Sequence, residues 1–206
     1  MLGILIHIIE FITFVFSIVY YKSLNRDGLG HLCLFLGLVF FLDMSGLFLN
    51  NLNFEYIGAF YASLILFQQL YFLRLLATWN QLKINFYLGA SVVIFWFLEL
   101  LSELETSSFP DKAIGIGAFV LFFNGLYFMY ILVVKKQTFN FFQRTDFWLV
   151  LGITIYNSLE FPYMIFLNTI KTEYPESLLL FGWFTTIFSF LMYISFCKAI
   201  TCSRRI

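Results

Sequence analysis

Apolar residues occur in seven long stretches along this chain, and short polar segments separate them. A helix that crosses a hydrocarbon core needs about 20 apolar residues, and each stretch is long enough. The expected helices cover residues 2–21, 29–50, 54–78, 84–104, 112–134, 146–168 and 177–199. Little sequence remains outside them. Residues 1–206 are therefore predicted to form one all-α membrane domain, a bundle of seven transmembrane helices.

The segments between the stretches contain residues that end or start helices. Residues 25–28 separate the first two helices, and Pro110 and Pro175 precede the fifth and the seventh. The alternative of a transmembrane β-barrel requires strands that alternate in polarity over about 10 residues. The run 114–134 does not alternate, which favours helices. The first stretch lacks the basic leader and cleavage site of a signal peptide, so we expect it to be a helix of the bundle.

Lys and Arg are distributed unequally over the two ends of the predicted bundle. One end carries Lys22, Arg26, Arg74, Lys83, Lys135, Lys136, Arg144, Lys198, Arg204 and Arg205, and the other carries Lys112 and Lys171. Basic residues concentrate on the cytoplasmic side of membrane proteins. We therefore expect the N-terminus outside the cell and the C-terminus in the cytoplasm.

Composition supports a membrane protein and excludes several other classes. Hydrophobic residues make up 61% of the chain and charged residues only 12%, about half the charged fraction of a soluble domain. A soluble enzyme, a nucleic-acid binder and a disulfide scaffold are thereby excluded, and the lipid bilayer is the expected surrounding. The net charge is zero, and Cys33, Cys197 and Cys202 match no metal-binding pattern.

Four acidic residues fall inside the predicted helices, where a charge costs several kcal/mol. They are Glu10, Asp43, Glu99 and Glu160, and counting from the helix ends places all four in the outer half of the membrane. The same count brings Glu10 level with Asp43. The one basic side chain near that depth is His7, three residues before Glu10 and on the same helical face.

Other polar residues accompany these acids. Asn157 precedes Glu160 by about one turn, and Pro162 follows it. Since proline in a membrane helix frees a carbonyl and bends the helix, we expect a bend at Pro162. Further hydrogen-bonding groups from the third, fifth and seventh helices are Gln68, Gln69, Tyr71, Asn124, Tyr127, Ser189 and Tyr193.

Two interpretations of the buried acids stay open. In the functional one, His7, Glu10, Asp43, Asn157 and Glu160 line an outward-opening polar cavity that takes a cation, a proton or a small ligand with an amine. In the structural one, each acid is protonated and bonded to a Tyr, Asn or Ser of a neighbouring helix, and Glu99 lies at the membrane surface.

Known site chemistries find no support. The last helix has Lys198 only at its inner end, so no lysine is placed to bind retinal. His7 and His31 are expected at opposite membrane faces, which excludes a histidine-rich zinc site. No glycine-rich phosphate loop occurs. We expect no cofactor, no metal and no enzymatic activity, although Asp43 and Glu160 leave a carboxylate enzyme acting on lipid open.

The chain resembles small bacterial seven-helix proteins that look like free-standing membrane sensor domains of histidine kinases. The matching residues are Tyr71, Phe72, Phe147, Trp148, Gly152, Tyr156, Phe161, Trp183 and the run 188–193. The resemblance implies an inner-membrane location and a sensory role, and it carries over no catalytic residue. With no output domain in this sequence, a signal would pass to a separate membrane or cytoplasmic partner.

These observations lead to one hypothesis and three alternatives. The hypothesis is a receptor-like sensor module that binds a small ligand or ion in the outward-facing cavity and signals to a partner protein. The alternatives are a small proton- or cation-coupled transporter, a membrane-embedded enzyme acting on lipid, and an assembly subunit. No motif identifies the ligand or an oligomeric state.

Overall fold

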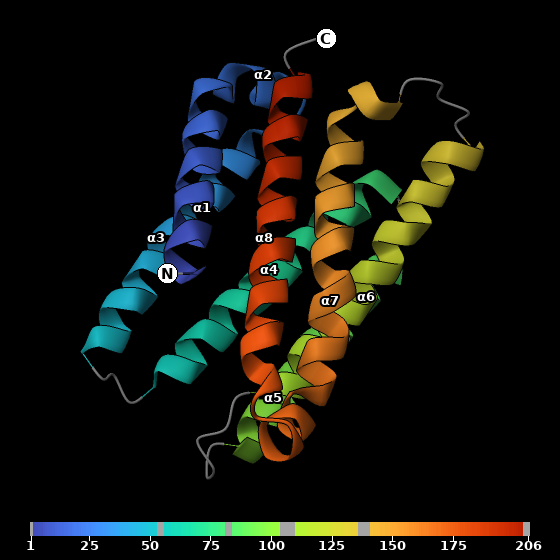
Figure 1. The fold of residues 1–206 in the computed structure, drawn as a ribbon. Helices are drawn as coiled ribbons and strands as arrows, with labels where there is room; N and C mark the ends of the chain where they lie inside the picture. The colour runs from blue at the N-terminus through green and yellow to red at the C-terminus, as the bar shows by residue number, and fades with distance from the viewer. Residues whose placement is uncertain (1, 53–55, 81–83, 104–109, 136–140, 204–206) are drawn as a thin grey trace.

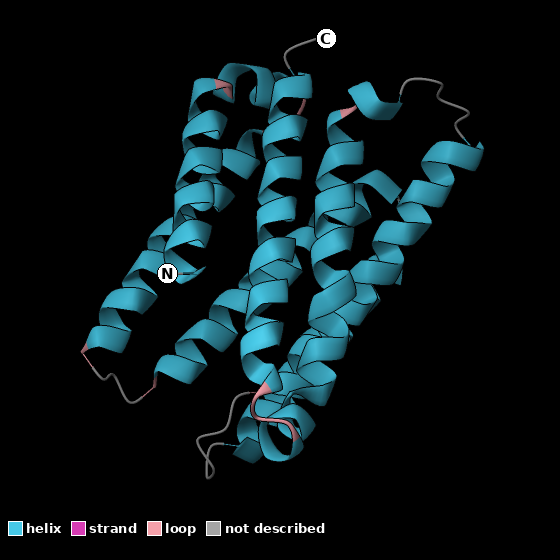
Figure 2. Ribbon diagram, in the orientation of Figure 1, coloured by secondary structure: helices cyan, strands magenta, loops and turns pink. Residues whose placement is uncertain are grey.

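The computed structural model describes residues 2–52, 56–80, 84–103, 110–135 and 141–203, and this part of the chain is all-helical (Figures 1 and 2). The long helices are α1 (Leu2–Val19), α3 (Gly30–Asn51), α4 (Ile57–Asn80), α5 (Ile84–Glu103), α6 (Asp111–Tyr130), α7 (Thr145–Glu173) and α8 (Ser177–Cys202). Three short elements complete the order, namely α2 (Tyr21–Arg26), a π-helical turn η1 (Ile131–Lys135) and a 3-10 turn η2 (Phe141–Gln143).

Five helices in the described part are long and apolar enough to cross a membrane, namely α3, α4, α6 with most of η1, α7 and α8. Shorter apolar helical segments occupy Leu5–Val19 of α1 and Tyr87–Glu99 of α5. The chain is therefore a multi-pass membrane protein, and the large apolar side chains exposed on its surface are suited to contact with lipid.

Backbone geometry explains where the helices end. The first predicted stretch breaks at Tyr20, and α2 then ends in a turn in which Gly28 has a φ of +74°, a conformation that favours glycine. The sixth stretch continues beyond its predicted end to Glu173. It stops at Tyr174 because a residue before proline, here Pro175, disfavours the helical conformation.

The helices alternate in direction through the bundle (Figure 1). Helix α1 packs against α3 and α8, and α7 packs against both α6 and α8. Side-chain contacts join Glu10 to Tyr193 and Thr13 to Cys197, so α1 and the C-terminal half of α8 are parallel. Contacts of Gln69 with Ile114 and of Trp79 with Phe128 make α4 and α6 parallel as well.

The apolar core is thickest at the end of the bundle that carries α2. Its fully buried members there include Leu24, Leu32, Leu76, Phe128, Leu132, Leu149, Phe196 and Ile200. The other end contains a smaller cluster around Ala62, Trp96 and Ile114. Glu10 of α1, Asp43 of α3 and Tyr193 of α8 lie further along these helices, away from the α2 end.

Candidate functional site

Three titratable side chains of α1 and α3 converge inside the bundle. His7 and Glu10 lie one turn apart on the same face of α1, with His7 Nδ1 3.1 Å from Glu10 Oε2. Asp43 approaches from α3, and one ligand atom of each residue lies within 4.8 Å of the other two. Glu10 is 4% exposed, whereas His7 and Asp43 are half-buried. We call His7, Glu10 and Asp43 the α1–α3 triad.

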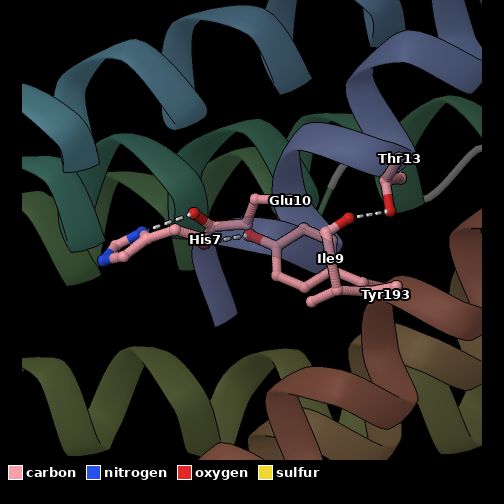
Figure 3. A network of polar contacts seen from close by, with 5 residues as sticks. All are labelled: His7, Ile9, Glu10, Thr13 and Tyr193. Atoms are coloured by element: carbon pink, nitrogen blue, oxygen red, sulfur yellow. Dashed lines mark hydrogen bonds and ion pairs between the residues drawn. The ribbon is translucent and has the colours of Figure 1, made fainter. Parts of the chain in front are cut away.

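Tyr193 of α8 fixes the Glu10 carboxyl from the other side. Its hydroxyl donates to Glu10 Oε1 at 2.9 Å, and the tyrosine is itself buried. Figure 3 shows Glu10 between His7 and Tyr193. The two oxygens of Glu10 therefore have different surroundings, since Oε1 is held by Tyr193 while Oε2 faces His7 Nδ1. Just beyond, Thr13 Oγ1 donates to the Ile9 carbonyl and lies 3.3 Å from Cys197 Sγ.

The carboxyl groups of Glu10 and Asp43 approach each other from α1 and α3, with an oxygen of one within 4.8 Å of an oxygen of the other. Two ionised carboxylates this close repel each other, and a proton or a cation between them removes that repulsion. Within the described residues, His7 is the only basic side chain in ion-pair contact with Glu10. The triad is therefore arranged to hold positive charge, either as a shared proton or as a bound cation.

Glu160 of α7, which is buried, pairs with the half-buried Tyr156 of the same helix. Tyr156 donates from its hydroxyl to Glu160 Oε1 at 3.1 Å, and Glu160 is 4% exposed. Tyr156 interacts electrostatically with Glu10 and with Asp43, so the pair lies within range of the triad. Polar side chains thus extend from α1 and α3 through α8 to α7.

Asn157 and Pro162 lie on the same helix. Asn157 Nδ2 donates to the Ile153 carbonyl, while its Oδ1 is buried without a hydrogen-bond partner among the described residues. Helix α7 continues through Pro162, which leaves the carbonyl four residues earlier, at Ser158, without its helical donor.

The other polar residues named from the sequence bond elsewhere. Gln69 donates to the Ile114 carbonyl of α6, and Asn124 to the Val120 carbonyl of its own helix. Tyr71 pairs with His31, whose Nδ1 lies 2.8 Å from the tyrosine hydroxyl. Ser189 bonds within α8, Gln68 is half-buried on α4 and Tyr127 is exposed on α6. Of the residues named from the sequence, Tyr193 alone is hydrogen-bonded to the triad within the described part of the chain.

Glu99 has a structural role that the sequence did not reveal. Its two carboxyl oxygens accept hydrogen bonds from the backbone amides of Lys112 and Ala113. These amides belong to the first turn of α6, where helical N–H groups have no partner and where the helix dipole favours negative charge. Glu99 therefore caps α6 from the neighbouring helix.

An apolar cavity of about 310 Å³, wide open at the protein surface, lies between α1 and α3 beside the triad. It is lined by His7, Ile8, Phe11, Phe40, Met44 and Leu47. His7 thus stands between this cavity and the carboxyl groups of Glu10 and Asp43, and the cavity wall is otherwise made of hydrophobic side chains.

No protein-family model, curated protein or solved structure matches this chain. Function is therefore inferred from the geometry of the site. Sequence reasoning brought Glu10 level with Asp43 by counting depth and placed His7 beside Glu10 by helical spacing. It missed Tyr156, although the spacing of Tyr156 and Glu160, one helical turn, was a signal that could have found the pair.

Proposed function

We propose that this chain is a receptor-like sensor module that spans a bacterial inner membrane seven times. It binds a small cation or an amine-bearing ligand at the α1–α3 triad and passes the signal to a separate partner protein. The observation that carries this proposal is the convergence of one imidazole and two carboxyl groups, one of which accepts a hydrogen bond from Tyr193 of α8. A buried polar group of this kind is costly in a membrane and is typical of functional sites.

The helix directions support seven spans. Helices α4 and α6 are parallel and both are long enough to cross a membrane, so α5 has to return the chain across the same thickness. Helix α1 runs beside the C-terminal half of α8, from the level of Tyr193 toward Ser203. Both shorter apolar helices are therefore counted as spans in this proposal.

Helix α8 offers a route from the site to the opposite end of the bundle. Tyr193 contacts Glu10, and ten residues later the Ser203 carbonyl accepts hydrogen bonds from Ser23 and Arg26 of α2. A ligand that moves Glu10 would displace Tyr193, and α8 would carry that displacement to α2. The expected cytoplasmic face would change shape where a partner can contact it.

The ligand-binding part of this proposal is tested on the purified full-length protein in lipid nanodiscs. Thermal unfolding is followed by tryptophan fluorescence with sodium, potassium, divalent metal ions and small amines. At least one class should raise the unfolding temperature, and the Asp43→Asn variant should lose that shift. The matched control is Glu173→Gln at the exposed end of α7. A shift that Asp43→Asn retains in full, or no shift with any class, would contradict the proposal.

A second candidate function is a proton- or cation-coupled transporter. The observation that favours it is the Glu160–Tyr156 pair, because a second buried carboxyl beside the triad provides a further step for a cation or proton. Proteoliposomes that accumulate a cation in response to a pH gradient would favour the transporter over the sensor, provided that Glu160→Gln abolishes the flux.

A further inference from the structure

The distances within the α1–α3 triad are close to those of a metal site. A zinc ion holds nitrogen and oxygen ligands at about 2.0–2.2 Å, which puts neighbouring ligand atoms of a tetrahedron about 3.3 Å apart. His7 Nδ1 and Glu10 Oε2 are 3.1 Å apart. The remaining separations are within 4.8 Å, so ligation requires a closure of at most about 1.5 Å, which the half-buried Asp43 side chain can supply by rotation.

Charge balance favours a divalent ion. Two ionised carboxylates and one neutral imidazole carry two negative charges, which a divalent cation neutralises. In the low dielectric of a helix bundle, a neutral site avoids most of the penalty for isolated charge. A monovalent cation would leave one negative charge uncompensated by the ligand.

The donor types select the class of metal. Calcium and magnesium prefer sites made only of oxygen, whereas His7 contributes an imidazole nitrogen. Soft ions such as copper(I) prefer sulfur ligands, and the triad contains none. One nitrogen and two carboxylates suit zinc and its first-row neighbours manganese, iron and cobalt, of which zinc binds most tightly to ordinary sites of this kind.

The surroundings orient the ligands as outer-shell groups do in metal sites. Tyr193 donates to Glu10 Oε1, so that Oε2, 3.1 Å from His7 Nδ1, is the oxygen that faces the ion. Ligation through Nδ1 places the imidazole proton on His7 Nε2, which points away from Glu10 (Figure 3). Such outer hydrogen bonds set ligand orientation and alter metal affinity by about 10–100-fold.

The geometry points to a binding site for a divalent transition metal of the zinc class, formed by His7 Nδ1 and one carboxylate oxygen each of Glu10 and Asp43. This inference rests on the proposed function and names its ligand. The three side chains leave a fourth coordination position for water or for a ligand group. The ion links α1 to α3 directly and to α8 through Tyr193, so its arrival and departure are the event that the sensor detects.

The test uses the full-length protein in nanodiscs, purified with a tag that contains no histidine and treated with a chelator. Zinc, manganese and cobalt are added separately, and bound metal is counted by mass spectrometry after dialysis. About one zinc ion per chain is expected. Cobalt should give a visible absorption spectrum of a low-symmetry site, which reports nitrogen ligation. Binding isotherms then give the affinity of each variant.

The chain provides a matched control because it contains two histidines. His7→Gln and Asp43→Asn should each weaken zinc binding at least tenfold, whereas His31→Gln should leave it unchanged. Where Asp43→Asn fails to fold, Asp43→Glu replaces it, and this variant should weaken binding while the unfolding temperature without metal changes little.

Three results would overturn the assignment: the absence of stoichiometric metal, equal loss of binding in His31→Gln and His7→Gln, or a cobalt spectrum that His7→Gln leaves unaltered. If metal fails to bind but a monovalent cation or an amine stabilises the protein in an Asp43-dependent manner, only the metal assignment is wrong. If no cation or amine has any effect, the proposed function fails with it.

Discussion

Buried acids in this chain differ in role according to the atoms that reach their two oxygens. His7 faces one carboxyl oxygen of Glu10, Tyr193 donates to the other, and Asp43 of α3 lies close by. Glu99 instead accepts two backbone amides at the start of α6. A buried glutamate thus lies at the centre of a cluster of polar side chains in one place and caps a helix in another.

Tyr193→Phe tests the hydrogen bond that joins α1 to α8. Removing the hydroxyl leaves Glu10 Oε1 without its donor, and hydrogen bonds between membrane helices are worth about 0.6–2 kcal/mol. We expect the free energy of unfolding in detergent to fall by about 1 kcal/mol. Tyr127→Phe, on the exposed face of α6, is the control and should change it little. Equal stability of both variants would show that the bond contributes nothing.

Glu99→Gln tests the cap of α6. The amide side chain keeps one acceptor oxygen but loses the negative charge that the helix N-terminus favours. The expected loss is about 1 kcal/mol, with no change in any binding at the triad. The unfolding temperature of Glu99→Gln is compared with that of Glu173→Gln, which loses the same charge but no cap. The difference between the two gives the effect of the cap. A change in ligand binding would mean instead that Glu99 belongs to the site.

How much of the site the sequence predicts depends on whether a contact is local. Helical spacing relates His7 to Glu10 within one turn, and depth counting relates Glu10 to Asp43 across two helices. The cap formed by Glu99 depends on how α5 and α6 meet, and the pairing of His31 with Tyr71 depends on the rotation of α3 against α4. Neither rotation nor helix approach is encoded in apolar periodicity, so these contacts required the structure.

At the scale of helices, α7 and α8 approach closely at Gly152. A Cβ atom built there would lie 3.0 Å from the Met192 carbonyl oxygen and 3.0 Å from the Ser195 Cβ. Small residues permit such close contact between membrane helices. The predicted helix ranges differ from the observed ones most at helix ends, as at Tyr20. Apolar residues continue there through a break in the helix that only the backbone geometry reveals.

Gly152→Ala and Gly182→Ala should change stability in opposite directions. At Gly152 the added methyl group forces α7 and α8 apart, which costs about 1–3 kcal/mol. At Gly182, also helical, nothing lies within 4 Å of the built Cβ. The substitution there should stabilise by up to about 1 kcal/mol through helix propensity. The measurement is the unfolding temperature of both variants. A higher unfolding temperature of Gly152→Ala would mean that α7 and α8 are not in close contact there.

At the scale of the whole molecule, the charges divide over the two ends of the bundle. Arg26 and Arg144 lie at the end that carries α2, and Arg144 donates two hydrogen bonds to Asp146. These hydrogen bonds raise the pKa of the Arg144 guanidinium, so its charge persists at any physiological pH. This end is the expected cytoplasmic face, because positive charge near helix ends sets orientation.

Cysteine accessibility tests both the orientation and the number of spans. Cys33, Cys197 and Cys202 are first replaced by alanine, and single cysteines are then introduced as Asn25→Cys, as Glu173→Cys or in a short extension before Met1. A membrane-impermeant maleimide applied to intact cells should label the extension and Glu173→Cys. It should label Asn25→Cys only after cell lysis.

Two other labelling patterns would contradict this expectation. Labelling of Asn25→Cys alone in intact cells would show that the orientation is opposite to the expected one. Protection of both Asn25→Cys and the extension would show that α1 does not cross, since a crossing α1 separates them. His7 and Glu10 would then lie on a helix anchored at the cytoplasmic face, and not near the outer side of the membrane. A ligand of the triad would in that case have to arrive from within the cell.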